Sequence, residues 1–141
     1  MPDTAKSLRE IARTWIEDGW QHGDDAVVDR LHAPGFVDHD PGGRTGDNAG
    51  FKEGIVRLFA AFPDLEAQVR DLVVDEAAGT VAVRWAARGT HRGPYLGAMP
   101  SGRTVDFKGI EIIRIENGLI TERWGEWDGI GLLDQLGRIA P

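Results

Sequence analysis

The sequence has no cysteine among its 141 residues, which excludes disulfides, a thiol nucleophile and thiolate metal sites. The formal net charge is −7, and no basic cluster occurs that would bind nucleic acid or an anionic membrane surface. No apolar run approaches the roughly 20 residues of a membrane span. Because the first residues also lack the apolar core of a signal peptide, we expect a cytoplasmic protein.

The composition is that of one folded domain. A chain of 141 residues fits a single domain, taken here as residues 1–141, and no linker or repeat divides it. Apolar residues make up 41% and charged residues 28%, as in ordinary globular proteins. Glycine is abundant, with 19 residues or about twice the average share, and its scattered positions indicate turns and helix caps.

Helical patterns dominate the first half of the chain. Ser7 and Glu10 form a capping box before an apolar stripe at helical spacing, and Gly23 ends this helix. A second, short helix follows. Asp47 is the expected cap of a third helix, which Pro63 terminates. The stripes of the first and third helices are Leu8, Ile11, Ala12, Trp15 and Ile16, and Phe51, Ile55, Leu58, Phe59 and Phe62.

Strand patterns dominate the second half. After an early short strand at residues 36–40, strands are expected at residues 65–75, 80–91, 104–115 and 119–127, followed by a short helix at 130–136. The pair Asn117-Gly118 suits the positive φ angles of a tight hairpin. Helices first and hairpin-joined strands afterwards predict an α+β fold, with the helices on one face of a curved antiparallel sheet.

The second half also carries a series of short motifs. They are Gly89-Thr90-His91-Arg92-Gly93, Gly97-Ala98-Met99-Pro100-Ser101-Gly102-Arg103, Phe107-Lys108-Gly109-Ile110, Arg114-Ile115-Glu116-Asn117-Gly118-Leu119-Ile120, Glu122-Arg123-Trp124 and Gly131-Leu132-Leu133-Asp134-Gln135-Leu136-Gly137. Upstream stand Phe36-Val37-Asp38-His39 and Phe62-Pro63-Asp64. With these motifs, the chain resembles the SnoaL-like polyketide (ester) cyclase family of the NTF2-like superfamily over nearly its whole length.

The resemblance implies a cone-shaped fold with a deep pocket at one end. In such a fold a curved antiparallel, or mixed, sheet is wrapped by three N-terminal helices and a short C-terminal helix. The resemblance further implies a small apolar or aromatic organic ligand, ring closure by aldol condensation without a cofactor, and a homodimer that packs sheet against sheet. The same fold also hosts isomerases, dehydratases, epoxide hydrolases and non-catalytic binding modules, so it does not decide the reaction.

An aldol closure needs a base that removes a proton next to a carbonyl, and donors for the enolate and the new alcohol. Asp128 matches the family's acid/base aspartate in the pattern Trp124-x-x-x-Asp128 and is the first catalytic candidate. Asp128 also stands immediately before a helix, where an aspartate is a common N-cap. Both interpretations stay open at the level of the sequence.

Glu111 and His39 are the other catalytic candidates. Glu111 lies mid-strand among apolar neighbours, so we expect it to line the pocket, to face solvent, or to pair with Arg84 or Arg88. Some family members carry a histidine where this chain has Glu111, a departure that bears on the cyclisation chemistry. His39 ends the first strand, where the resemblance implies a pocket histidine, and a surface histidine in a polar turn is the alternative.

The expected ligand-contacting residues are mostly aromatic. They are Trp124, Phe107, His91, Phe59, Tyr95 and Met99. Trp124 and Phe107 are placed in the pocket wall, while Tyr95 and Met99 belong to a loop that covers either ligand or a dimer partner. His91 either lines the pocket mouth or holds this loop by a hydrogen bond. No metal site is expected, because no second histidine has ligand spacing.

Three functions fit these patterns. The first is a cyclase or related proton-transfer enzyme acting on a carbonyl compound. The second is another reaction on the same scaffold, such as epoxide hydrolysis, which needs two carboxylates and an arginine around one water. Glu111, Asp128 and Arg84 or Arg88 are the convenient set for it in the sequence. The third is a non-catalytic small-molecule binder in which Asp128 turns outward as a helix cap.

Overall fold

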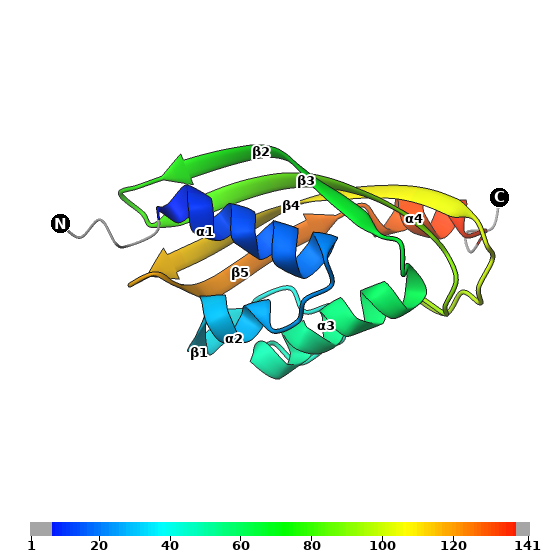
Figure 1. Ribbon diagram of the computed structural model, residues 1–141, viewed down its shortest axis with the longest axis horizontal. Helices are drawn as coiled ribbons and strands as arrows, with labels where there is room; N and C mark the ends of the chain where they lie inside the picture. The colour runs from blue at the N-terminus through cyan, green and yellow to red at the C-terminus, as the bar shows by residue number, and fades with distance from the viewer. Residues whose placement is uncertain (1–6, 138–141) are drawn as a thin grey trace.

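A curved sheet carries most of the helices on its inner side, as Figure 1 shows, and the computed structural model describes residues 7–137. The elements in chain order are α1 (Leu8–Thr14), the π-helix η1 (Trp15–Gln21), α2 (Val27–Leu31), β1 (His32–Asp38), α3 (Asn48–Ala61), β2 (Glu66–Asp75), β3 (Thr80–Thr90), β4 (Thr104–Glu116), β5 (Leu119–Trp127) and α4 (Gly129–Gln135). The strand order is β1-β5-β4-β3-β2, with β1 parallel to β5 and the other neighbouring pairs antiparallel. The predicted α+β fold with a mixed, curved sheet is confirmed.

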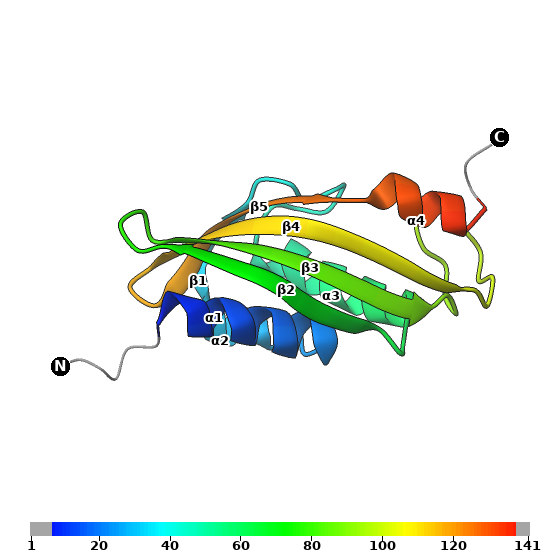
Figure 2. The ribbon, with the colours of Figure 1, turned by 90° about the horizontal axis from the view of Figure 1, so that it is seen from above.

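Strict alternation along β4 creates the two faces of the sheet. Its odd-numbered residues from Val105 to Ile115 are buried, and its even-numbered residues are mostly exposed. The inner face packs against α1, α2 and α3 in a core that includes Ile11, Trp15, Val27, Leu31, Phe51, Ile55, Val81, Val83, Ile113 and Ile120. Helix α4 follows β5 at the far end of the sheet (Figure 2) and contacts β4. No helix within residues 7–137 is long and apolar enough to cross a membrane.

The predicted helix caps and hairpin are confirmed. Ser7 caps α1 by accepting a hydrogen bond from the amide of Glu10 (3.1 Å), and Asp47 caps α3 through its own side chain. The hairpin between β4 and β5 has φ angles of 51° at Asn117 and 79° at Gly118, as a tight turn of this sequence requires. These features depend on neighbours along the chain, which is why the sequence predicts them.

The first strand differs from the prediction in its extent. It spans His32–Asp38 rather than residues 36–40, and its register against β5 shifts between His32 and Val37. Pro34 is tolerated inside it because β1 lies at the edge of the sheet, where one side of a strand makes no ladder hydrogen bonds. Residues 39–47 are therefore free to form a long connection to α3.

The first helix changes its hydrogen-bonding pattern halfway, where the sequence predicted one regular helix. In η1 the amide of His22 bonds to the carbonyl of Glu17, five residues earlier, at 3.1 Å. Residues five apart point to different sides of an α-helix, but the wider π turn brings them to the same side. Trp15 and Trp20 therefore both pack on Phe51, with ring centroids 5.6 and 5.4 Å from it.

A buried histidine connects this helix to β1 and α3. The indole Nε1 of Trp15 donates to Nε2 of His32 at 2.9 Å, so the imidazole proton lies on Nδ1, 3.1 Å from Oδ1 of Asn48. Asn48 in turn donates to the carbonyl of Ala33 at 3.0 Å. Burial disfavours the charged imidazolium and lowers the pKa of His32 from 6.5 to about 4, although Asn48 acts in the opposite direction.

The folding stability is predicted to fall as the pH drops from 6.5 towards 4. In this range the unfolded chain takes up a proton on His32 and the folded protein does not, so the free energy of unfolding rises with pH. The loss across the window is about 3 kcal/mol by linkage from the shift in pKa. Urea denaturation at several pH values measures it. A His32→Gln variant whose stability falls as steeply as the wild type would contradict this assignment, and His22→Gln, at an exposed position, is the matched control.

Candidate functional site

A cavity of about 700 Å³ lies between the inner face of the sheet and the helices. Its walls come from η1, α3, the strands β2 to β5, and the two loops at residues 40–44 and 94–97. The aliphatic part of the lining is Ile16, Leu58, Leu65, Ala67, Ala87 and Leu96. A cavity of this size and character is suited to a small, largely apolar organic molecule.

Three aromatic rings form the sheet side of the cavity. Phe107 meets Trp85 and Trp127 edge to face, with ring centroids 6.0 Å apart in both pairs. Gly109 lies between the two tryptophans, and a Cβ atom there would be 2.6 Å from the Trp85 ring and 2.8 Å from Cβ of Trp127. A glycine in the middle of β4 thus makes room for both indoles.

One end of the cavity is charged. Its core is the Arg123 cluster, made of Arg123, Glu111, Asp38 and Arg44. Nε of Arg123 donates to Oε1 of Glu111 at 2.5 Å, and its Nη1 donates to Oδ1 of Asp38 at 2.8 Å. Burial alone would lower the pKa of Arg123, but the charges and hydrogen bonds of Glu111 and Asp38 outweigh burial and raise that pKa. The guanidinium is therefore charged at every physiological pH.

The loop after β1 wraps this cluster. Asp40 accepts a hydrogen bond on Oδ2 from the amide of Gly125 (2.8 Å), and its carbonyl accepts from Nη1 of Arg123 (3.1 Å). Arg44 donates from Nε to the carbonyl of Pro41 at 2.8 Å, and its Nη2 lies 3.6 Å from Oδ2 of Asp38. Burial lowers the pKa of Arg44, because the desolvated guanidinium is only partly compensated by Asp38. Asp40, Arg44, Glu111 and Arg123 all line the cavity.

The loop between β3 and β4 forms part of the cavity mouth. Tyr95 and Ala98 pair their main chains across a tight turn, with Leu96 at φ 50° and Gly97 at φ 79°. Tyr95 and Leu96 line the cavity, although leucine is rarely found in this left-handed region. Burial raises the pKa of the Tyr95 phenol, so the hydroxyl keeps its proton and acts as a hydrogen-bond donor.

Comparison with known proteins identifies the family. A sequence model described as SnoaL-like polyketide cyclase matches residues 10–136, which is nearly the whole chain. The chain belongs to this family. No curated protein matches the sequence at a significant level. The cavity and the Arg123 cluster are therefore the candidate site of a SnoaL-like protein, and cyclase-type function is the broad expectation for it.

Solved structures share the SnoaL-like fold. TsrD from Streptomyces laurentii is 28% identical, with a TM-score of 0.84 over 94% of this chain and 96% of its own. IdmH from Streptomyces antibioticus, a suggested polyketide cyclase, is 29% identical, with a TM-score of 0.79 over 94% and 99%. AclR from Streptomyces galilaeus, a suggested hydroxylase, is 25% identical, with a TM-score of 0.80 over 96% and 89%. Two different reactions are thus suggested for relatives with this fold.

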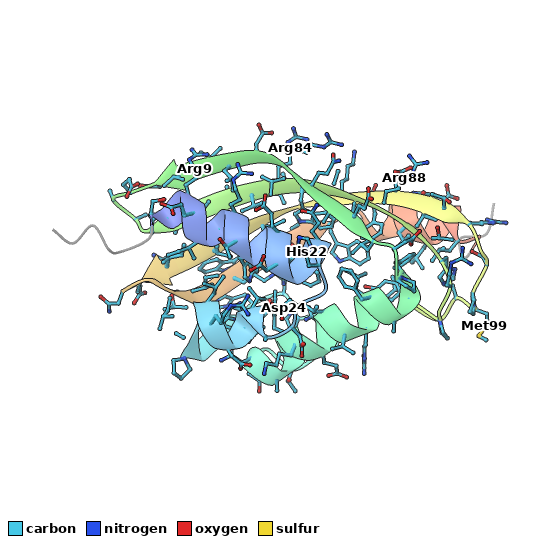
Figure 3. All side chains as sticks on the ribbon, in the orientation of Figure 1. Arg9, His22, Asp24, Arg84, Arg88 and Met99 are labelled. Carbon is cyan, nitrogen blue, oxygen red and sulfur yellow. The ribbon has the colours of Figure 1, made fainter. Side chains whose placement is uncertain are left out.

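Three of the predicted site residues meet in the SnoaL-like cavity, namely Glu111, Phe107 and Tyr95. Glu111 is buried, and its ion-pair partner is Arg123 rather than the Arg84 or Arg88 expected from the sequence. Arg84 and Arg88 project from the opposite face of the sheet, as Figure 3 shows, where they pair with other exposed carboxylates. Among residues 7–137, no group of three or more side chains suited to hold a metal ion is found.

Asp128, His39 and Trp124 lie outside the cavity lining. Asp128 is exposed and caps α4, accepting on Oδ1 from the amide of Gly131 at 2.8 Å. His39 stacks on Trp124 with ring centroids 4.8 Å apart and bonds to Glu122 at 2.8 Å. The physical reason is the parity of the second half of β5, where Arg123, Gly125 and Trp127 face inward, so that Trp124 points to the outer face. The capping alternative for Asp128 and the surface alternative for His39 are the ones that the structure adopts.

The remaining predicted ligand contacts also lie away from the cavity lining. His91 is fully buried and holds the mouth loop, because its Nδ1 accepts from the amide of Ser101 at 3.2 Å. Phe59 packs in the core beside Gly23 rather than in the cavity wall. Met99 is 74% exposed at the outer end of the mouth loop (Figure 3).

Five charged residues of the site were not predicted, namely Asp38, Asp40, Arg44, Arg57 and Arg123. One signal for Arg123 was present in the sequence. Alternation places Arg123 on the same strand face as Gly125 and Trp127. A charged residue on that face needs a partner if the face is the inner one, which the sequence alone does not decide. Asp38 and Asp40 carry no such signal, because the contact from Asp38 to Arg123 joins residues 85 positions apart.

Removal of the α4 cap is predicted to change stability and leave the site intact. Asp128→Ala should lower the free energy of unfolding by about 1 kcal/mol, because the amide of Gly131 loses its acceptor. Turnover per folded molecule should stay close to that of the wild type, since the side chain lies outside the cavity lining. Chemical denaturation and an activity assay on the same preparation measure both quantities. Loss of turnover in Asp128→Asn without loss of stability would restore the aspartate as the catalytic base.

Proposed function

We propose that this SnoaL-like chain is a cofactor-independent enzyme that performs acid/base chemistry on a small apolar carbonyl compound. The reaction is an aldol-type ring closure, begun by removal of a proton next to a carbonyl. The observation that carries the proposal is a largely apolar cavity of about 700 Å³ with both acidic residues and arginines at one end. A carboxylate supplies the base that such a reaction needs, and a guanidinium supplies the counter-charge for an enolate.

The cavity walls support an aromatic or otherwise flat substrate. Trp85, Phe107 and Trp127 offer ring faces and edges on the sheet side, and Leu58 and Leu65 offer aliphatic surface. A substrate held against these walls directs its polar atoms to the charged end, because the aliphatic and aromatic walls provide few partners for them. The phenol of Tyr95 is a further donor at the mouth.

Epoxide hydrolysis is the second candidate, and one observation favours it. Two carboxylates, Asp38 and Glu111, meet on one arginine, Arg123, which is the combination that the hydrolysis of an epoxide by an activated water requires. The sequence suggested Glu111, Asp128 and Arg84 or Arg88 for this reaction. The structure instead brings Glu111 together with Asp38 and Arg123, which again makes two carboxylates and one arginine. Against this candidate, Asp38 is fully enclosed, and its side chain does not belong to the cavity lining.

The carbonyl reaction is tested by deuterium incorporation. Aromatic compounds with two ketone groups are incubated with the protein in D₂O, and NMR follows deuterium at the carbon next to the carbonyl together with ring closure. Enzyme-dependent incorporation is the expected result, because reversible proton removal exchanges that position. The same panel includes an aryl epoxide, whose conversion to a diol would favour the second candidate. A protein that binds the compounds and converts none of them is a binding module.

A matched pair of variants separates cavity chemistry from surface effects. Ala67→Phe fills the cavity from β2, and Ala86→Phe adds the same ring on the outer face of β3, away from the cavity lining. Exchange should fall at least about tenfold in the first variant, since the substrate loses its space, and should be unchanged in the second. Circular dichroism shows whether both variants are folded. Equal rates in the two variants would contradict a reaction inside the cavity.

We also propose that the protein is a homodimer that packs through the outer face of the sheet. This face carries a row of neighbouring residues from four strands, Val73, Ala82, Ile112 and Trp124. Val73 is 65% exposed, and Ile110 beside the row is 51% exposed. Apolar side chains side by side on an open sheet face are typical of a surface that a partner covers.

Sedimentation velocity tests the dimer. The wild type should sediment as a dimer, and Ile112→Lys should shift it to the monomer, because the new charge would be buried without a partner. Val56→Lys, at an exposed position on α3, is the control and should leave the dimer intact. A wild-type protein that is monomeric at tens of micromolar overturns the proposal.

A further inference from the structure

We infer that Asp40 is the base that removes the substrate proton, and that Arg44 pairs with the enolate oxygen formed in that step. The inference rests on the proposed function and names the two groups within it that touch the reacting atoms. Both groups stand on the loop between β1 and α3, where the sequence suggested His39 and neither of these two residues as a catalytic candidate.

Within residues 7–137, two acidic residues line the cavity, Asp40 and Glu111. Both oxygens of Glu111 are engaged, Oε1 with Nε of Arg123 at 2.5 Å and Oε2 with Nε1 of Trp85 at 3.1 Å. To take up a substrate proton, Glu111 would weaken its bond to a guanidinium that is itself buried. Uncompensated buried charge is costly, so Glu111 is suited to hold Arg123 in place rather than to act as the base.

The carboxylate of Asp40 is held on one side only. Its Oδ2 accepts from the amide of Gly125 at 2.8 Å, and no donor among the described residues reaches Oδ1. The main chain of Asp40 is fixed from both directions, since its amide donates to Asp38 at 3.0 Å and its carbonyl accepts from Arg123 at 3.1 Å. One oxygen is thus open to a ligand while the residue is positioned before the ligand binds, as a general base requires.

Arg44 has one nitrogen, Nη2, that can donate a hydrogen bond to an anionic oxygen of the substrate. Its Nε and Nη1 donate to main-chain carbonyls of Pro41 and Gly50 at 2.8 and 3.2 Å, which fixes the plane of the guanidinium. Its Nη2 lies 3.6 Å from Asp38, beyond hydrogen-bond distance, and Oδ2 of Asp38 has no hydrogen-bond partner among the described residues. A negative oxygen in the cavity would therefore complete the coordination of Arg44.

The charges at this end favour a neutral substrate that becomes an anion. Two guanidiniums, Arg44 and Arg123, face three carboxylates, Asp38, Asp40 and Glu111. The remaining arginine of the lining, Arg57, pairs with Glu53, so one negative charge is left over. Proton transfer to Asp40 neutralises its carboxylate and creates a negative enolate oxygen at the same moment. The total charge in the cavity is unchanged, and the new anion lies against Arg44.

The step is balanced without a further reactant. The C–H bond next to the carbonyl breaks, an O–H bond forms on Oδ1 of Asp40, and the electron pair moves to the carbonyl oxygen beside Arg44. The enolate carbon then attacks the second carbonyl of the substrate to form the new C–C bond. The alkoxide that results takes the proton back from Asp40, which returns the carboxylate to its starting state.

The exchange assay in D₂O tests this assignment with three variants. Asp40→Asn keeps an acceptor for Gly125 and removes the base, so the exchange rate should fall at least about a hundredfold while substrate affinity changes little. Glu111→Gln disturbs Arg123 but keeps the base, so its exchange rate should fall less than that of Asp40→Asn. Asp106→Asn, at an exposed position of β4, is the control and should behave as the wild type. Exchange that survives Asp40→Asn overturns the inference and leaves the proposed reaction standing.

A binding measurement answers the same question without turnover. The probe is 2-naphthol, whose neutral and ionised forms differ in fluorescence and whose ionised form resembles an aromatic enolate. Asp40→Asn should bind the ionised form at least about tenfold more tightly than the wild type, because its side chain is neutral as Asp40 is after proton transfer. Adding Arg44→Met to that variant should remove the gain.

The two measurements separate the possible failures. If the wild type exchanges none of the ketones but Asp40→Asn binds the ionised probe more tightly, the proposed reaction fails and the charge pair of Asp40 and Arg44 stands. If wild type and Asp40→Asn bind the ionised probe equally, the assignment of these two residues is overturned, whatever the activity of the wild type.

Discussion

The buried guanidinium of Arg123 is the interaction on which the geometry of the site depends. A guanidinium stays charged when it is buried, so the fold must surround it with acceptors. Asp38 from β1 and Glu111 from β4 provide the charges, and the carbonyl of Asp40 provides a further acceptor. The edge strand, the central strands and the loop after β1 are thereby fixed around one side chain of β5.

The charged end has its place because neighbouring positions carry no side chain. A Cβ atom at Gly125 would collide with the guanidinium of Arg123 and approach Oε1 of Glu111 to 3.2 Å. A Cβ atom at Gly109 would likewise collide with Trp85 and Trp127 of the aromatic wall. A polar cluster and an aromatic wall thus share the inner face of two neighbouring strands, and two glycines provide the room. Substitution of either glycine, even by alanine, reaches the site directly.

Features that depend on nearby residues could be predicted from the sequence, and features that depend on distant contacts could not. The caps at Ser7 and Asp47, the Asn117-Gly118 hairpin and the alternation of β4 are local, and all are present. Alternation correctly placed Trp124 and Glu126 on the same face of β5. The sequence does not say, however, which face of the strand is the inner one. Apolar residues occupy both faces of this sheet, so the outer face resembles a core in the sequence.

The candidate site shows the same division. Glu111, Phe107 and Tyr95 could be placed in the cavity because each lies in a strongly patterned strand or loop. For Asp128, a helix cap and a catalytic base call for the same residue type, so the sequence alone could not choose. Asp40 and Arg44 belong to a connection without periodicity, and the position of Asp40 depends on contacts with Arg123 and Gly125 of β5, which lie 83 and 85 residues later in the chain.

The backbone winding of the π-helix η1 decides which way its two tryptophans point. Its wider turns hold seven residues, Trp15–Gln21, and turn Trp20 to the cavity while Trp15 stays in the core. A π-helical segment holds about one residue more than the α-helix that would cover the same turns, so deleting one residue between the tryptophans would restore α-helical winding and leave the later residues nearly in phase. Trp15 and Trp20 would then be four residues apart and would still lie on one side of the helix. The extra residue of this segment is thus absorbed by the backbone, and both indoles keep their direction.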